Sequence, residues 1–169
     1  MKELIKTKKW DITLRFATEE DTLLIFNFIK DLAQYEKLFN EVEATEELLR
    51  ETLFGERKYV EILIAEFKGA PAGFAIFYHN FSTFLGKPGI YVEDLFVKPE
   101  FRKNGIGKTL LSYITKLGAE RNCGRIEWAV LDWNEPAIQF YRSLGSIPKD
   151  EWTIYRLSGS ALIDLAKEF

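Results

Sequence analysis

The stretch that decides the fold is YVEDLFVKPEFRKNGIGKTLL, residues 91–111. It begins as an apolar, strand-like run that ends near Pro99, because proline cannot continue a hydrogen-bonded ladder. Two glycines follow, and leucine and isoleucine then recur at helical spacing. Residues 89–122 therefore predict a strand, a loop and a helix. Backbone N–H groups and the dipole at a helix start attract phosphate oxygens, so we interpret the loop as an anion site.

Two kinds of phosphate ligand suit this loop. RKNGIGKTLL, residues 102–111, matches the G-x-x-x-x-G-K-[ST] loop of nucleoside triphosphatases, except that Arg102 replaces the first glycine. It also matches R-x-x-G-x-G, the pattern of a loop that wraps the pyrophosphate of coenzyme A. Arg102 lacks the conformational freedom of glycine, and little chain follows for a parallel nucleotide-binding sheet. EWAVLD is an apolar run that ends at Asp132, like the magnesium-binding strand of nucleoside triphosphatases. Both interpretations therefore stay open.

Hydrophobic periodicity outlines the rest of the chain. The order of elements, β-α-α-β-β-β-α-β-α-β, describes an α/β fold of the α+β kind, in which helices cover the faces of a mixed sheet. We expect a single domain over residues 1–169 with its core over about 11–157. Thr18 and Thr45 are expected to cap the first two helices. Strands are expected over residues 10–17, 59–67, 74–81, 125–132 and 152–157, and helices over 19–38, 40–54, 134–145 and 158–169.

Composition narrows the range of functions. The net charge of the 169 residues is -3, which gives no general reason to bind nucleic acid or an anionic membrane surface. Cys123 is the only cysteine and His79 the only histidine. An intrachain disulfide is therefore excluded, and the chain lacks the several histidines that a histidine-based metal cluster requires. We expect a cytoplasmic protein with no metal, no nucleic-acid partner and no membrane segment.

Four segments of the chain resemble those of one known family. They are residues 91–111, AVLDWNEPAIQFYRSLG at 129–145, RFATEED at 15–21 and IKDLAQYEK at 29–37. Together they resemble the GCN5-related N-acetyltransferase (GNAT) superfamily. The resemblance is closest to its diamine acetyltransferases, the spermidine/spermine and thialysine N-acetyltransferases. It implies the GNAT acyl-CoA N-acyltransferase fold, a central mixed, mostly antiparallel sheet flanked by helices.

The resemblance also implies an activity. Family members transfer acetyl from acetyl-coenzyme A (acetyl-CoA) to an amine, which here would be a primary amine of a small diamine, polyamine or lysine-like thialysine. Direct attack in a ternary complex and a homodimer are expected. The segment AVLDWN, residues 129–134, leans toward the thialysine-like branch. Two alternatives stay open, a coenzyme A-binding regulatory module of the same fold without turnover and the P-loop nucleoside triphosphatase.

The family pattern assigns residues to the cofactor. The pantetheine arm of coenzyme A is expected to lie like an extra strand beside residues 95–97, while the loop that follows surrounds the pyrophosphate. Basic side chains of the loop place positive charge where the ligand is negative. The expected cofactor-binding residues are Leu95, Phe96, Val97, Arg102, Lys103, Asn104, Gly105, Ile106, Gly107, Lys108, Asn134, Pro136, Ala137 and Tyr141.

Acetyl transfer requires an unprotonated amine, yet an alkyl amine has a pKa near ~10.4, so a base or a water path must remove a proton. By resemblance, the pair Glu93 and Asp94 binds the amine and relays its proton. Adjacent strand residues face opposite ways, so only one should enter the groove unless a bulge turns the chain, and we choose Glu93. Tyr141 resembles the family's acid that protonates the departing thiolate. The expected acceptor-binding residues are Tyr35, Glu36, Glu93, Asp94, Glu127, Trp128 and Ala129.

Overall fold

The computed structural model of the protein describes residues 3–169, which form two compact units, one that ends at Ala129 and one over Val130–Phe169. The first unit is built on a six-stranded sheet in which the strands follow one another in sequence order. Its strands are β1 Ile5–Lys6, β2 Ile12–Phe16, β3 Glu61–Phe67, β4 Ala70–Ser82, β5 Lys87–Val97 and β6 Ile126–Trp128. Neighbouring strands are antiparallel except β5 and β6, which are parallel. The predicted mixed, mostly antiparallel sheet is confirmed, and the short β1 is an addition that the sequence pattern did not predict.

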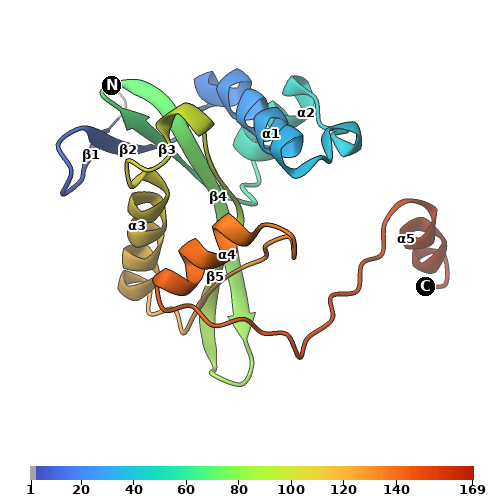
Figure 1. Cartoon of the computed structure of the whole chain (residues 1–169). Helices are drawn as coiled ribbons and strands as arrows, with labels where there is room; N and C mark the ends of the chain where they lie inside the picture. Colours follow the sequence, from blue (N-terminus) through green and yellow to red (C-terminus); the bar gives the residue numbers. More distant parts are fainter. Residues whose placement is uncertain (1–2) are drawn as a thin grey trace. The chain divides into compact units, whose positions relative to one another are not determined.

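Helices cover both faces of this sheet (Figure 1). One face carries a core in which Phe28 of α1 stacks on Phe74 of β4, with ring centres 5.1 Å apart. On the other face lies α3, whose Gly118 packs against Ile90 and Ile126. The helices of the first unit are α1 Thr22–Glu36, α2 Glu46–Phe54 and α3 Ile106–Glu120, with short 3-10 turns at η1 Glu19–Asp21, η2 Phe39–Glu41 and η3 Pro99–Phe101.

The starts of α1 and α2 follow from their caps. Thr45 caps α2 as predicted, because its hydroxyl oxygen accepts a hydrogen bond from the Leu48 N–H at 3.2 Å. At α1 the chain first makes η1, so the α-helix begins three residues later than the predicted start at residue 19. The Thr18 N–H and hydroxyl both donate to Asp21 Oδ2, at 2.9 and 3.1 Å. Thr18 therefore anchors η1, and α1 continues from it.

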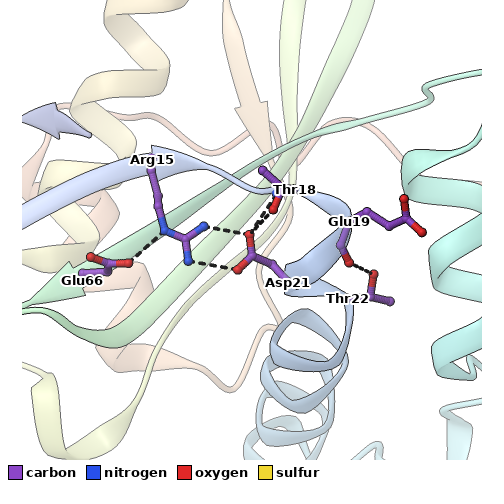
Figure 2. A network of polar contacts seen from close by, with 6 residues as sticks. All are labelled: Arg15, Thr18, Glu19, Asp21, Thr22 and Glu66. Carbon is purple, nitrogen blue, oxygen red and sulfur yellow. Dashed lines mark hydrogen bonds and ion pairs between the residues drawn. The ribbon is translucent and has the colours of Figure 1, made fainter. Parts of the chain in front are cut away.

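A buried ion pair joins the start of α1 to the sheet (Figure 2). The two terminal nitrogens of Arg15 on β2 donate to the two carboxylate oxygens of Asp21, at 2.8 and 3.0 Å. Arg15 Nε donates to Glu66 Oε1 on β3 at 2.9 Å. Arg15 and Asp21 are 5% and 4% exposed. Paired in this way, the two charges fix where α1 leaves the sheet.

The second unit contains α4 Glu135–Ser143 and α5 Gly159–Ala166. Asn134 caps α4 by accepting from the Ala137 N–H at 3.4 Å, and Gly145, with φ 86°, ends it. The predicted strand at 152–157 is not formed, because these exposed residues pair with no strand in the described part of the chain and a strand requires a partner. The strand predicted at 125–132 is likewise shorter, ending at Trp128. Among the described residues, no helix is both long and apolar enough to cross a bilayer.

Candidate active site

A β-bulge shapes the acidic pair on β5. Asp94 is opposite Ile76 of β4, whereas Val92 is opposite the next residue, Phe77, so Glu93 is an extra residue in the ladder. The usual alternation of side chains is interrupted there, and the charge of Glu93 acts on both Asp94 and Tyr78. The bulge therefore breaks the strict alternation on which the sequence prediction relied, and it leaves Glu93 close enough to Asp94 for its charge to act on that residue.

A small pocket of about 200 Å³ lies beside Asp94. Its walls come from α1, from the segment that follows α1 and from β5. The lining is apolar apart from three carboxylates, and a few convergent polar groups in an apolar pocket are typical of small-molecule sites. The lining residues are Ile29, Leu32, Ala33, Glu36, Leu38, Glu41, Val42 and Asp94. Negative charge on aliphatic walls suits an aliphatic cation.

Burial and neighbouring charge tune this pocket for proton transfer. Burial, as the largest cause, and the nearby charges of Glu93 and Glu36 together raise the pKa of Asp94 from 3.8 to about 6. Burial also raises the pKa of Glu36. A carboxyl group with a pKa near 6 can accept and release a proton close to neutral pH. Asp94 is therefore a carboxyl group in the pocket lining whose protonation changes close to neutral pH.

Only some of the predicted acceptor-binding residues line the pocket. Glu36 and Asp94 line it, whereas Glu93 is exposed and lies outside the lining. Tyr35 lies one residue before Glu36 and carries the guanidinium of Arg102 4.4 Å from the centre of its ring. Glu41 lines the pocket and was missed by the sequence prediction, which placed it in a helix over 40–54, whereas it lies in η2 before α2 begins at Glu46.

The predicted acceptor residues on β6 have structural contacts of their own. Glu127 is opposite Tyr91 and Trp128 is opposite Val92 in the parallel pairing with β5. The Glu127 carboxylate accepts a hydrogen bond from the side-chain amide of Asn80 at 2.8 Å and forms an ion pair with Arg125. These contacts give the Glu127 carboxylate a structural role within the sheet. Ala129 is the last residue of the first unit.

The edge of β5 is open beside the residues expected to hold the pantetheine arm. β6 pairs only with residues 90–92 of β5, although β5 continues to Val97. Within residues 3–129, no further strand pairs with this edge at Leu95, Phe96 and Val97, whose other edge pairs with β4. An open edge offers backbone N–H and C=O groups to an extended ligand. The prediction that the pantetheine arm lies here as an added strand requires an edge of this kind.

The loop after β5 is shaped by two residues in the left-handed region, Lys103 with φ 65° and Gly105 with φ 85°. α3 begins at Ile106, and the N–H groups of its first turn lack intrahelical partners. Arg102 folds back so that its Nε donates to the Val97 carbonyl at 3.0 Å. The Thr109 hydroxyl donates to the Gly105 carbonyl at 3.0 Å, as expected of an ordinary helix residue. The loop thus provides free N–H groups with basic side chains around them.

The remaining predicted site residues lie in the second unit on α4. Asn134 is 7% exposed and caps the helix, and Pro136 lies in its first turn with Ala137. Tyr141 follows Asn134 by seven residues, about two helical turns, and its ring centre lies 5.3 Å from that of Phe140. The prediction of a short helix capped by Asn134 is confirmed.

The model of the acetyltransferase (GNAT) family matches residues 26–145. The match spans most of the chain and includes the strand, the loop, α3 and α4. The chain belongs to this family, and it is an acetyl-CoA-dependent N-acetyltransferase.

Individual relatives agree with that assignment. The thialysine N-epsilon-acetyltransferase of Bos taurus is 36% identical over 166 residues, which cover 92% of this chain and 97% of the relative. The L-ornithine N5-acetyltransferase of Arabidopsis thaliana is 31% identical, covering 88% of this chain and 85% of the relative. An integron cassette protein from the mobile metagenome of V. cholerae has a TM-score of 0.78 at 28% identity, covering 93% of this chain and 98% of that one. The resemblance drawn from the sequence segments is thereby confirmed.

Proposed function

We propose that the protein transfers acetyl from acetyl-CoA to a primary amine of a small molecule that carries a second positive charge. A diamine, a polyamine or a lysine-like compound such as thialysine meets this description. The observation that carries the proposal is the pocket of about 200 Å³, in which Glu36, Glu41 and Asp94 interrupt apolar walls. A pocket of this size admits the end of a small molecule, so the acceptor end that enters it is short. The relatives named for thialysine and ornithine support the same chemical class.

The reaction requires the amine to lose a proton and the thiolate to gain one. The amine nitrogen attacks the acetyl carbonyl carbon, a C–N bond forms, and the C–S bond breaks. We assign the first proton to Asp94, because its raised pKa and its place in the pocket suit a base. Glu93, the base chosen from the sequence, then shares the site as a neighbouring charge that helps to raise the pKa of Asp94. Tyr141 keeps its predicted role as the acid for the thiolate.

Residues of the first unit fit coenzyme A in a specific way. The open edge at Leu95, Phe96 and Val97 suits the pantetheine arm. The loop residues Arg102, Lys103, Asn104, Gly105, Ile106, Gly107 and Lys108 suit the pyrophosphate, because the turn brings free N–H groups and positive charge together. The family resemblance adds Asn134, Pro136, Ala137 and Tyr141 to the same ligand. The cofactor supplies the activated acetyl thioester, and the chain's own residues bind it and move the protons.

Binding and transfer should be measured separately in variants of the acidic pair and Tyr141. Coenzyme A binding is followed by calorimetry, and acetyl transfer by thiol release with a panel of diamines, polyamines, lysine analogues and peptides. Asp94→Asn should lower kcat/KM by about a hundredfold or more and leave coenzyme A affinity unchanged. Tyr141→Phe should lower kcat, and Glu93→Gln should shift the pH dependence with a smaller loss.

The wild-type pH profile gives an independent check. Asp94 must be ionised to accept a proton, so kcat/KM should rise as pH rises through about 6, and Asp94→Asn should lack that step. If the wild type binds acetyl-CoA yet acetylates no amine in the panel, the enzyme proposal fails and the non-catalytic alternative stands. Magnesium-dependent ATP binding in place of coenzyme A binding would favour the triphosphatase, which the family match does not favour.

We further propose a cytoplasmic homodimer that needs no metal and binds neither nucleic acid nor membranes. These expectations rest on the family resemblance and on the net charge of -3. Sedimentation of the purified protein tests the dimer, and a monomer at micromolar concentration with full activity would contradict it. Activity measured after treatment with a metal chelator tests whether the enzyme needs a metal, and we expect the activity to be retained.

A further inference from the structure

A lysine from the N-terminal hairpin reaches the loop between β5 and α3. Lys9 lies in the turn between β1 and β2, and its Nζ donates to the Asn104 carbonyl at 2.6 Å across 95 residues of sequence. The ammonium occupies the space beside Gly105, where a Cβ would collide with it. The loop therefore has a cationic neighbour that does not belong to the motif.

The turn holds Lys9 in place. The Lys9 N–H donates to Thr7 Oγ1 at 3.1 Å, and the Thr7 hydroxyl donates to the Ile12 carbonyl at 2.8 Å. β1 and β2 pair in register on either side, with Ile5 opposite Leu14. The backbone position of Lys9 is therefore set by the hairpin, and only the side chain needs to adjust to a ligand.

We infer that Lys9 contacts the pyrophosphate of coenzyme A, an inference that rests on the proposed cofactor site. A lysine ammonium has three donors, of which the Asn104 carbonyl takes one. It lies beside Gly105, directly before the first-turn N–H groups of α3 that attract phosphate oxygens. A charge-assisted hydrogen bond to a phosphate oxygen uses the remaining donors, and the ammonium need not leave the loop to form it.

The experiment compares Lys9→Gln with Lys8→Gln, which removes the same charge from the neighbouring exposed residue of the same turn. Calorimetry gives the Kd of coenzyme A and of 3′-dephospho-coenzyme A for the wild type and both variants, over a series of salt concentrations. Lys9→Gln should weaken the binding of both ligands by about threefold to tenfold and make the binding less dependent on salt. Lys8→Gln should change the Kd by less than about twofold, and Lys9→Arg should restore most of the loss.

Each other outcome overturns the inference. Equal Kd values for the two glutamine variants would exclude a specific contact. An effect that disappears with 3′-dephospho-coenzyme A would move the contact to the 3′-phosphate. Weaker binding with an unchanged salt dependence would assign Lys9 only to bracing the Asn104 carbonyl. A wild type that binds no coenzyme A would instead refute the proposed function, so the two failures are distinguishable.

Discussion

At the scale of single residues, the charge of Asp94 costs the folded protein free energy. Its pKa is raised from 3.8 to about 6, chiefly by burial, so the folded state binds this proton more tightly than the unfolded state does. The free energy of unfolding that depends on this group is therefore greatest below about pH 4 and falls as pH rises through about 6. A buried carboxylate at a site where a proton must be accepted is a common exchange of stability for function.

Asp94→Asn removes that charge with little change of shape. We expect the variant to exceed the wild type in free energy of unfolding by up to about 3 kcal/mol at pH 8, and to equal it well below pH 4. Urea unfolding at the two pH values measures the difference. A variant that is less stable than the wild type at pH 8 would contradict the pKa shift on which the proposed base rests.

Glu41 tests the need for a second positive charge in the acceptor. Its carboxylate lines the pocket with Glu36 and Asp94, whereas the exposed Glu43 nearby does not. Glu41→Gln should raise the KM for 1,4-diaminobutane by about threefold to tenfold and leave the KM for butylamine unchanged, because only the diamine carries a second cation. Glu43→Gln is the matched control. Equal effects of Glu41→Gln on both amines would show that Glu41 does not select the second charge.

At the scale of elements, the buried ion pair of Arg15 and Asp21 decides how α1 joins the sheet (Figure 2). Asp21→Ala leaves the Arg15 charge buried, with Glu66 as its remaining ion-pair partner among the described residues. We expect a loss of about 3 to 5 kcal/mol in the free energy of unfolding, since removing one partner of a buried pair strands the other. The exposed pair Arg50 and Glu46 is the control, and Glu46→Ala should cost less than about 1 kcal/mol. Similar losses in both variants would refute the distinction.

Elements were predictable where their signals are local. Thr45 capped α2 as expected, and the spacing of Leu110, Leu111 and Ile114 predicted α3, because both depend on a few neighbouring residues. The strand predicted at 152–157 is absent from the described residues, since strand pairing requires a partner that local sequence does not supply. The two-residue β1 was missed because so short a segment carries no periodicity.

At the scale of the whole molecule, the exchange rates of backbone amide hydrogens should differ between the paired strands and the segment where the predicted strand is absent. β3 and β4 are paired on both edges over much of their length, whereas residues 153–157 take part in no strand ladder. We expect amide hydrogens of the central strands to exchange only on global unfolding, and those of 153–157 to exchange at nearly unfolded rates. Hydrogen exchange at concentrations where the chain is monomeric measures both. Strong protection of 153–157 in the monomer would contradict the structure.

The sequence by itself determined the family and the strand, loop and helix around residues 91–111, because each depends on short-range pattern. It placed Glu36 and Asp94 in the candidate site but favoured Glu93 as the base. Only the tertiary structure showed that a bulge interrupts β5 at Glu93, that Glu41 joins Glu36 and Asp94, and that Lys9 reaches Asn104. These features depend on strand register and on contacts between residues far apart in the chain, which no local pattern encodes.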